Sequence, residues 1–576
     1  MEIIATDVLV VGAGPAGLTA AALLARAGVR SLTVTKYGGT ADSPRAHITN
    51  QRAVEIFRDL GIEDRVMRRA LPQHLMGKQV FATSFAGREI ARMMTWGAGE
   101  ERTGEYRAAS PCAMCNAPQH VLEPILLDAA RDFGAEIRFD SEVVTVEQSR
   151  DDARVRVRRR GDGSPYEIRA RWVVGCDGAR TIVGEQGGFA FDGQAGLGDA
   201  VTVWIEADLA KYTKHRSGAL FFVVSPADEQ LLSIWTCVEP WNEWSTIFAR
   251  RDLESTDLSE EAVLKRVRVA IGDPDVAIRV KKISPWQFNH VVARSYRNGR
   301  LFLAGDAAHR HPPANGLGSN TSIQDAYNLA WKLALVTSGT ADESLLDSYD
   351  AERQPVGRRI VERANRSVGE MVPFFEALGF VPGATESAAM AQVDSLLGPG
   401  GDARRDALLA ALDLMNGQFN AHGVEMGQRY ASPAVVDDGT PFPAPERDPD
   451  LFHQPTTHPG APLPHVWLER GTAEVSTLDL CAYDRFTLLL GVGGARWAEA
   501  ARAVGDRFGV RVEPVVIGLG QRNNDTLGQW IRRREIGDDG CLLVRPDRVV
   551  SWRSAGTVAE PERALADVLG RILGRS

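Results

Sequence analysis

Cysteines, long apolar runs and blocks of basic residues are all scarce in this sequence. Six cysteines among 576 residues are too few to build a disulfide-based scaffold. No uninterrupted apolar run approaches the roughly 20 residues that a membrane span needs, and no cluster of Lys and Arg suggests a nucleic-acid partner. The first apolar stretch has no basic segment before it, which argues against a cleavable secretion signal. We therefore expect a cytoplasmic protein that binds neither membrane nor nucleic acid.

The rest of the composition is typical of a globular protein. Apolar residues make up 44% of the chain and charged residues 24%, and the formal net charge is -9. A chain of this length is too long for a single hydrophobic core. We expect two or three domains.

A glycine-rich turn lies between a predicted strand, residues 7–12, and a predicted helix that ends near Gly28. The spacing G-x-G-x-x-G lets the backbone turn tightly, approach a pyrophosphate and pack the helix against the strand. The pyrophosphate would lie at the helix N-terminus, where free N–H groups and the helix dipole favour negative charge. The motif predicts a dinucleotide site. Its candidate residues are Gly12, Gly14, Pro15, Ala16 and Gly17.

The second predicted strand, residues 29–36, lacks the acidic residue that usually binds the dinucleotide ribose at this point. Thr35 and Lys36 stand there instead. Either another group binds the ribose, or Lys36 binds a 2′-phosphate and the dinucleotide is NADP. In the second case the chain could be an NADP-binding regulatory module, but the motifs that follow favour FAD.

Two further motifs lie at the ends of predicted strands. The stretch 173–180 contains Asp177-Gly178, and the stretch 303–309 contains Gly305-Asp306. After the glycine motif, these pairs resemble the DG and GD motifs of the class A flavoprotein monooxygenases, the para-hydroxybenzoate hydroxylase type. The resemblance implies that Asp306 binds the ribityl chain of FAD and that Asp177 supports FAD and NAD(P)H binding. A carboxylate at the end of a buried strand is suited to accept hydrogen bonds from a polyol.

A glycine-rich segment follows Asp306 and leads into a long predicted helix at 321–339. Its backbone N–H groups can approach a flat ring, and the positive end of the helix favours the flavin edge that becomes negative on reduction. The resemblance implies contacts from Gly318 and Asn320 to the isoalloxazine. The candidate residues of this segment are Pro313, Gly316, Gly318, Ser319 and Asn320. Two nearby histidines, His309 and His311, lack a third ligand at suitable spacing, so we expect no metal site.

Other segments resemble the phenol hydroxylase branch of this family, which includes 2,4-dichlorophenol 6-monooxygenase and 2-hydroxybiphenyl 3-monooxygenase. They are residues 44–52, 118–119, 240–244, 324–332 and 348–353. The resemblance extends over essentially the whole chain and implies that Arg45 and Gln119 contact FAD. It also implies that His47 lies near the substrate, where a neutral imidazole can accept the proton of a phenol. The alternative is that His47 is only a structural histidine.

Two positions depart from the pattern of the biphenyl hydroxylases. Asn116 replaces an Asp, and Glu239 replaces an Arg. We take Asn116 and His47 as the candidate catalytic residues. The departures are compatible with a different phenol or with a hydroxypyridine.

The resemblance also implies a reaction. NADPH or NADH reduces bound FAD, O2 adds to give a flavin C4a-hydroperoxide, and a phenol-like ring takes up one oxygen atom ortho to its hydroxyl. The alternative is a tailoring hydroxylase of a hydroxypyridine or a polyketide phenol, of the piericidin type, rather than a degrader of chlorophenols or biphenyls. The paired Asp-Gly and Gly-Asp motifs argue against a flavin oxidase or dehydrogenase. The family further implies a homo-oligomer.

The expected fold class is α/β, with a doubly wound, Rossmann-like FAD-binding domain and a mixed-sheet substrate domain. A separate C-terminal domain, thioredoxin-like by resemblance, follows a Pro-rich linker. The expected ranges are 1–75, 109–185 and 286–400 for the FAD-binding domain, 76–108 and 186–285 for the substrate domain, 401–460 for a helical segment with the linker, and 461–576 for the C-terminal domain.

Two other motifs suggest chemistry that we do not expect. Cys112 and Cys115 form a lone C-x-x-C, without the second pair that zinc would need. Residues 491–494 form a second glycine-rich turn between a strand pattern and a helix pattern. Its third glycine is misplaced and no matching acid follows, so we expect this turn to be structural.

Overall fold

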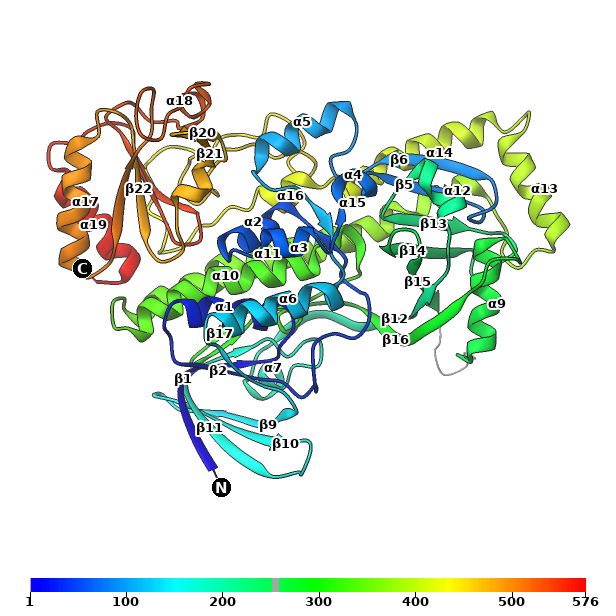
Figure 1. The fold of residues 1–576 in the computed structure, drawn as a ribbon, viewed down its shortest axis with the longest axis horizontal. Coiled ribbons are helices and arrows are strands. Elements are labelled where there is room, and N and C mark those ends of the chain that lie inside the picture. The colour runs from blue at the N-terminus through cyan, green and yellow to red at the C-terminus, as the bar shows by residue number, and fades with distance from the viewer. Residues whose placement is uncertain (1, 251–257, 576) are drawn as a thin grey trace.

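The computed structural model describes residues 2–250 and 258–575, apart from the side chains of residues 249 and 250. Part of the expected substrate domain, residues 251–257, lies outside the described residues, as do Met1 and Ser576. In Figure 1 the N-terminal strands lie at the bottom, a second sheet lies at the right and the C-terminal region lies at the upper left. Two long helices, α10 (Gly318–Thr337) and α11 (Asp347–Glu370), cross the middle between them.

The first sheet has a parallel centre, in the strand order β17-β18-β11-β1-β2-β8. Helix α1 packs against both α6 and α10 beside this sheet. The apolar residues at the end of β1 are fully buried, as expected for a parallel strand covered on both faces. The elements are β1 (Glu2–Val11), α1 (Pro15–Arg26), β2 (Ser31–Val34), α6 (Gln119–Asp132), β8 (Glu136–Arg138), β9 (Ser141–Gln148), β10 (Ala153–Arg159), β11 (Pro165–Gly175), α7 (Ile182–Gln186), β17 (Arg297–Asn298) and β18 (Leu301–Leu303).

The second sheet has the order β19-β16-β12-β15-β14-β13-β5-β6 and its own apolar core. Most pairs are antiparallel, but β5 and β13 are parallel, so the sheet is mixed as expected. A helix, α9 (Glu260–Ile271), interrupts the strand-rich segment, which the strand pattern did not predict. The strands are β5 (Lys78–Ala82), β6 (Glu89–Met94), β12 (Phe191–Glu206), β13 (Leu220–Val224), β14 (Leu232–Glu239), β15 (Glu243–Arg250), β16 (Arg279–Ala293) and β19 (His309–Arg310).

A small third sheet lies between the two large ones and is formed by β3 (Ile48–Thr49), β7 (Cys115–Asn116) and β4 (Leu71–Pro72). Ile48 pairs with Asn116, so this sheet joins two segments that are far apart in sequence. The remaining helices are α2 (Gln51–Asp59), α3 (Glu63–Met67), α4 (Gln73–Met76), α5 (Glu100–Ala109), α8 (Ala210–Thr213), α12 (Val372–Leu378), α13 (Glu386–Leu397), α14 (Asp402–Leu414), α15 (Asn416–Phe419) and α16 (His422–Met426).

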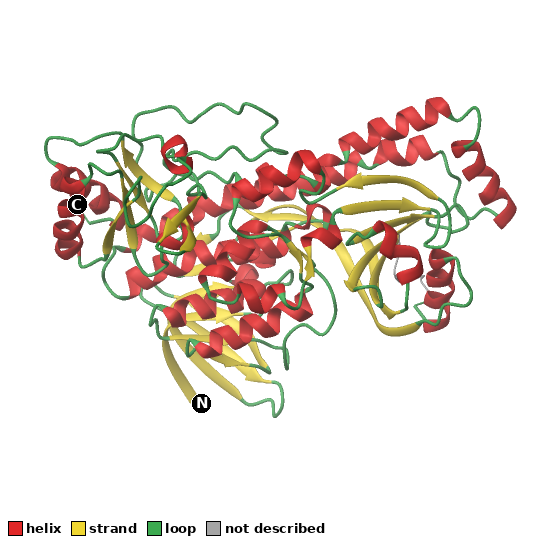
Figure 2. Cartoon of the chain, turned by 45° about the horizontal axis from the view of Figure 1, so that its top comes forward, coloured by secondary structure: helices red, strands yellow, loops and turns green. Residues whose placement is uncertain are grey.

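The C-terminal region contains a four-stranded sheet in the order β23-β22-β24-β25 and helices on its faces (Figure 2). β22 and β23 are parallel, whereas β24 is antiparallel to β22 and to β25. The elements are β20 (Trp467–Arg470), β21 (Ala473–Ser476), β22 (Phe486–Leu490), α17 (Ala495–Phe508), β23 (Val512–Val516), α18 (Gln529–Arg533), β24 (Cys541–Val544), β25 (Val550–Ser554) and α19 (Pro561–Leu573).

This region is less separate than the Pro-rich linker suggested. One buried apolar cluster contains both Val10 of the first sheet and Leu488 of the C-terminal sheet. The end of the expected linker is held by backbone hydrogen bonds to β25, from the Gly460 N–H to the Val550 carbonyl and from the Val550 N–H to the Ala461 carbonyl. The end of the Pro-rich segment is therefore paired with the C-terminal sheet, and the domain boundaries stay a prediction.

Candidate active site

Four of the predicted segments meet at one edge of the first sheet. β18, β11, β1 and β2 are neighbours, and the three pairings between them are parallel. Their carboxyl ends lead into Gly305-Asp306, Asp177-Gly178, the glycine turn and Thr35-Lys36. This edge of an open parallel sheet is the usual place for a ligand.

In the glycine turn, Gly12 and Gly17 pack closely against other parts of the backbone, whereas Gly14 has free space in front of it. A Cβ on Gly12, whose φ is 108°, would lie 2.2 Å from the Cys176 carbonyl oxygen, and one on Gly17 would lie 1.9 Å from the Gly12 carbonyl oxygen. At Gly14 the nearest described atom is a Glu123 oxygen at 3.8 Å. Helix α1 starts at Pro15 with neither a side-chain cap from the described residues nor an acidic residue in its first turn. Its free N–H groups therefore suit an anion such as a pyrophosphate.

The two motif carboxylates both keep an oxygen available. Asp177 Oδ2 accepts hydrogen bonds from the Ile182 and Val183 N–H groups at 2.7 and 3.2 Å, so it caps α7. Its buried Oδ1 has no partner among the described residues, and burial raises the pKa of this carboxyl. Asp306 is exposed although both of its neighbours in the chain are buried. These oxygens are free to bind a polyol or a hydroxyl.

A buried carboxylate that the sequence analysis missed, Asp325 of α10, holds the Gly305-Asp306 turn. Asp325 Oδ2 accepts the Gly305 N–H at 3.0 Å and lies 2.9 Å from His309 Nε2. Arg353 of α11 donates from Nε to Asp325 Oδ1 at 2.8 Å, and this pair is fully buried. His309 thus has a carboxylate partner within the protein and serves the turn rather than a metal.

The segment 313–320 is attached to β3, the strand that directly follows His47. The Asn320 amide donates to the Ile48 and Gly316 carbonyls at 2.8 and 2.6 Å and accepts the Asn50 N–H at 3.0 Å. The Asn320 side chain is therefore occupied by protein, which leaves only its backbone for the flavin contact that we expected. A Cβ on Gly316 would lie 2.8 Å from the Ile48 Cβ, so this glycine is needed for close packing.

The rest of this segment leads into α10. Gly318 and Ser319 are half-buried in its first turn, which has no side-chain cap from the described residues. Pro313 is exposed at the start of the segment. The uncapped N–H groups of α10 suit a group that becomes negative.

His47 and Asn116 are hydrogen-bonded across the small third sheet. His47 Nδ1 lies 3.0 Å from Asn116 Oδ1, and Asn116 Nδ2 donates to the Cys237 carbonyl at 2.7 Å. Because Asn116 offers its oxygen, Nδ1 of a neutral His47 must carry the proton. The Nε2 lone pair then points away from Asn116, with the Thr236 hydroxyl 3.4 Å from it. Burial lowers the pKa of His47 to about 4, so the ring is neutral near pH 7.

The N-terminus of α6 completes this region. The Gln119 N–H donates to the Arg45 carbonyl at 2.9 Å, and the Arg45 side chain is exposed. Gln119 Nε2 also donates to buried Glu123, which accepts the Ala41 N–H as well. Glu123 was not predicted, and it fixes both Gln119 and the segment before Arg45. Burial raises the pKa of Glu123.

Three sequence candidates have less support from the geometry. Thr35 is buried, with its hydroxyl 3.5 Å from the Tyr37 nitrogen, and the Lys36 ammonium lies 5.6 Å from the Tyr37 ring. Both follow β2 at the site edge, but neither presents a free group toward the glycine turn. Glu239 is exposed at the end of β14, so the departure at this position has no visible effect on the site.

The second glycine-rich turn is filled by the chain itself. The Gly493 N–H donates to the Asp538 carbonyl at 2.8 Å, and a Cβ on Gly491 would lie 2.3 Å from the same oxygen. Cys112 and Cys115 are buried free thiols, and burial raises the pKa of each. We keep the prediction that both motifs are structural.

Within the described ranges, one group of side chains has the spacing to hold an ion, namely Asp437, Asp438 and His458. Arg553 forms an ion pair with Asp438, and His458 Nε2 lies 2.9 Å from the Thr440 carbonyl oxygen. These partners already occupy the group, so it gives no support for a metal. Among the described helices, none combines the length and the apolar character needed to cross a bilayer.

Comparisons with known proteins agree with this geometry. Residues 5–364 match the family model described as FAD binding domain, and residues 456–576 match that described as aromatic-ring hydroxylase, C-terminal. The chain is 44% identical to 2,4-dichlorophenol 6-monooxygenase of Cupriavidus pinatubonensis over 99% of this chain and 97% of that one. It is 42% identical to phenol 2-monooxygenase of Pseudomonas sp. (strain EST1001) over 99% and 93%. The crystal structure of the flavin-dependent monooxygenase PieE with FAD and substrate superposes with a TM-score of 0.97 and 45% identity, and the match covers 100% of both chains.

Proposed function

Because this chain belongs to the FAD-dependent aromatic-ring hydroxylases, we propose that it inserts one oxygen atom of O2 into a phenol-like ring, ortho to the hydroxyl. The resemblance inferred from its motifs is confirmed by the two family models and by relatives over 40% identical. NADPH or NADH supplies the electrons. The observation that carries the proposal is the neutral His47, which is bonded through Nδ1 to Asn116 and keeps a lone pair on Nε2, with a long contact of 3.4 Å to the Thr236 hydroxyl.

The described residues fit FAD. The open face of Gly14, the unpartnered Asp177 oxygen and the exposed Asp306 lie at the carboxyl edge of one sheet. When bound, FAD supplies the redox chemistry, activates O2 and delivers the oxygen atom. We assign its pyrophosphate to the glycine turn. The other residues proposed to bind it are Arg45, Gln119, Asp177, Gly178, Gly305, Asp306, Pro313, Gly316, Gly318, Ser319 and the backbone of Asn320, with Thr35 and Lys36 toward the adenosine.

His47 has two tasks in this proposal. With a pKa of about 4 it is too weak a base to deprotonate a resting phenol, but its Nε2 can accept a hydrogen bond from the phenol O–H. That bond places electron density on the ring and orients it. When the ring is attacked by oxygen, its hydroxyl becomes a strong acid, and even a weak base then accepts the proton. Asn116 keeps Nδ1 protonated and so keeps Nε2 available.

The domain organisation that we propose follows the expected one, except that β16 and β19 of the second sheet reach beyond residue 285. The first sheet with α1, α6 and α10 corresponds to the FAD-binding domain, and the second sheet to the substrate domain. A thioredoxin-like C-terminal domain is supported by its strand–helix–strand unit, β22-α17-β23, followed by the hairpin β24-β25 and helix α19. The turn before α17 contains no cysteine, so we propose no redox role for this domain.

The proposal is tested by incubating the purified protein with NADPH or NADH, O2 and a panel of aromatic compounds. The panel contains phenol, chlorophenols, 2-hydroxybiphenyl, hydroxypyridines and polyketide phenols, and products are scored by mass. We expect at least one phenol-like compound to accelerate NAD(P)H oxidation and to gain one oxygen atom. Acceptance of only hydroxypyridines or polyketide phenols would favour a tailoring hydroxylase. NAD(P)H oxidation without any oxygenated product would contradict the proposal.

A further inference from the structure

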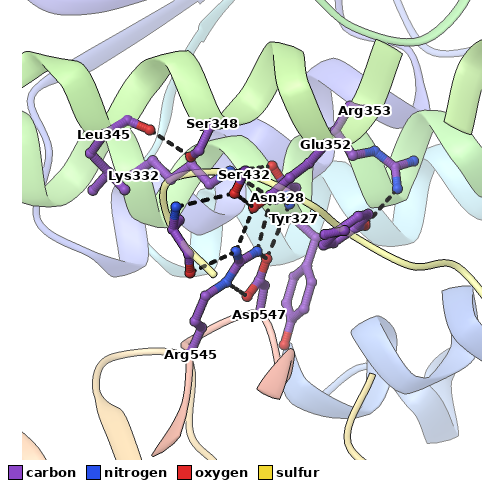
Figure 3. Close-up of polar contacts among 12 residues, drawn as sticks. Tyr327, Asn328, Lys332, Leu345, Ser348, Glu352, Arg353, Ser432, Arg545 and Asp547 are labelled. Carbon is purple, nitrogen blue, oxygen red and sulfur yellow. Dashed lines mark hydrogen bonds and ion pairs between the residues drawn. The ribbon is translucent and has the colours of Figure 1, made fainter. Parts of the chain in front are cut away.

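Four charged side chains are buried together where the C-terminal domain meets α10 and α11. They are Lys332 and Glu352 of the two helices, and Arg545 and Asp547 of the turn between β24 and β25 (Figure 3). Lys332, Glu352 and Arg545 have side chains that are 0% exposed, and that of Asp547 is 3% exposed. Two positive and two negative charges therefore balance within one buried cluster.

Arg545 is the centre of this cluster. Its guanidinium donates to both oxygens of Glu352, at 2.5 and 2.9 Å, and to both oxygens of Asp547, at 2.9 and 2.6 Å. Such a fork between two carboxylates needs the planar guanidinium, because an ammonium cannot bond both pairs of oxygens at once. Arg545 thereby fixes Glu352 relative to the C-terminal sheet.

Asn328 and Lys332 of α10 tie this helix to the same carboxylate. Lys332 Nζ donates to Glu352 Oε2 at 2.8 Å and to Asn328 Oδ1 at 2.8 Å. Asn328 Nδ2 donates to Glu352 Oε2 at 2.7 Å and to Asp547 Oδ2 at 3.2 Å. Both α10 and α11 are therefore bonded to the C-terminal domain, α10 through Asn328 to Asp547 and α11 through Glu352 to Arg545.

The next residue of α11 continues the chain of contacts to the flavin motif. Glu352 faces Arg545, and its neighbour Arg353 bonds Asp325, which accepts the Gly305 N–H. A shift of α11 that breaks the Glu352 contact must also move Arg353. Because Arg353 and Asp325 are fully buried, water cannot replace the lost contact cheaply. The Gly305-Asp306 turn would then lose its fixed position.

We propose that Arg545 is a positioning residue for FAD: through Glu352, Arg353 and Asp325, it lets the C-terminal domain hold the Gly305-Asp306 turn in its binding conformation. The proposal rests only on FAD binding and not on the identity of the aromatic substrate. It gives the C-terminal domain a task in the flavin site, which lies on another part of the molecule (Figure 1).

The first test compares Arg545→Met with Arg553→Met. Arg553 lies in the same C-terminal sheet and also pairs with two carboxylates, Asp438 and Glu535, but neither of these leads to α10 or α11. The dissociation constant of FAD is measured by flavin fluorescence at a temperature where both variants are folded. We expect Arg545→Met to raise the dissociation constant of FAD about tenfold. Mutations along a network of contacts usually change the free-energy coupling between two sites by an amount of this order. Arg553→Met should change this constant less than about twofold. Equal changes in both variants, or none in Arg545→Met, would overturn the proposal.

Two further measurements keep the test decisive if Arg545→Met does not fold. Arg545→Lys keeps the charge but not the fork, so we expect weaker FAD binding and an altered visible spectrum of the bound flavin, with the fold retained. In the unmodified chain, linkage requires the reverse effect, because FAD must stabilise the contacts that position it. Adding FAD to the FAD-free protein should slow hydrogen exchange at β24 and β25 more than at the edge strand β23, which β22 separates from β24. Unchanged exchange at β24 and β25, or an Arg545→Lys variant with normal FAD affinity and spectrum, would overturn the proposal.

Discussion

The two polar clusters along α10 differ in how far their groups are satisfied. At the N-terminal end, one Asp177 oxygen has no partner among the described residues, the Asp306 carboxylate is exposed, and His47 Nε2 has a long contact of 3.4 Å to the Thr236 hydroxyl. Farther along α10, Lys332 donates hydrogen bonds to Asn328 and to Glu352 of α11, and Glu352 also accepts from Arg545. Buried polar atoms almost always have partners in a folded protein, so we expect a ligand to complete the unpartnered Asp177 oxygen at the carboxyl edge of the first sheet. We therefore propose that the first cluster is a ligand site and the second a scaffold.

The two glycine-rich turns show the same contrast. The turn that contains Gly14 is open in front of α1, whereas the turn that contains Gly493 donates its N–H to Asp538. Similar strand–glycine–helix sequences thus lead to a ligand site in one case and to a packed loop in the other. The difference lies in segments distant in sequence, which fill one turn and leave the other free.

The largest effect is expected for His47→Ala, which removes the Nε2 atom that we propose accepts the phenol O–H. We expect hydroxylation to slow by about 10²- to 10⁴-fold, the usual contribution of a general acid–base group. FAD binding should change little, since the His47 imidazole bonds Asn116 and approaches Thr236 rather than a flavin motif. Single-turnover product formation and FAD titration check both statements. The control is His120→Ala on α6, which should hydroxylate normally. Equal loss of FAD binding and hydroxylation in His47→Ala would mean that His47 is structural.

Glu352→Gln should produce the largest loss of stability. It leaves Arg545 and Lys332 buried without their shared carboxylate, and breaking a buried pair in this way costs about 3–5 kcal/mol. Urea unfolding measures the change. Glu343→Gln is the matched control, because Glu343 pairs with Arg300 but is 41% exposed, and such pairs contribute about 1 kcal/mol or less. A loss below 1 kcal/mol in Glu352→Gln would show that the scaffold cluster is not needed for stability.

The glycine turns can be tested by Gly12→Ala and Gly491→Ala. Each new Cβ would lie little more than 2 Å from a carbonyl oxygen, at 2.2 and 2.3 Å, so each variant should lose stability by about 1–3 kcal/mol through strain. Only Gly12→Ala should also abolish FAD binding, because only that turn is open to a ligand. Fluorescence titration with FAD distinguishes the two. A Gly491→Ala variant that binds FAD as poorly as Gly12→Ala would contradict the claim that only the first turn binds FAD.

The smallest effect concerns pH. Burial lowers the pKa of His47 to about 4, so the imidazole stays neutral from pH 8 down to about pH 5. We expect kcat/KM for hydroxylation to show no inflection near 6.5, the usual pKa of histidine. Asn116→Asp places a carboxylate on Nδ1, which raises the pKa of His47 and should make the rate fall as pH decreases through the raised value. An inflection near 6.5 in the unmodified protein would contradict the account of His47.

The sequence predicted the flavin motifs because their signals are local. A glycine spacing or an Asp-Gly pair at the end of an apolar strand determines its own turn, and parallel strands bring such turns to one edge. The mixed α/β class and the family were recognised from these motifs and are confirmed. The resemblance named His47 and Asn116 as candidates but did not predict the bond between them, because the two residues lie 69 positions apart in the sequence.

The buried charges escaped prediction because they depend on distant partners. Asp325, Asn328 and Lys332 form a polar stripe on one face of α10, which a sequence pattern indicates as a solvent-exposed face. The stripe is buried because α11 and Arg545 of the C-terminal domain cover it. The one available signal for its burial was that this polar stripe lies in a helix whose other residues are mostly apolar or small. The pairing of the end of the Pro-rich segment with β25 was not predicted for a related reason, since composition does not show it.

The most direct test of the proposed function uses isotopically labelled oxygen. The protein is supplied with NADPH, with ¹⁸O2 and with a phenol that accelerates NADPH oxidation, and the product is examined by mass spectrometry. The function proposed here predicts one ¹⁸O atom per product molecule, bonded ortho to the original hydroxyl. It also predicts that His47→Ala forms this product far more slowly than the unmodified protein. A product whose new oxygen comes from water, or ¹⁸O2 consumed only to hydrogen peroxide with every phenol tested, would contradict it.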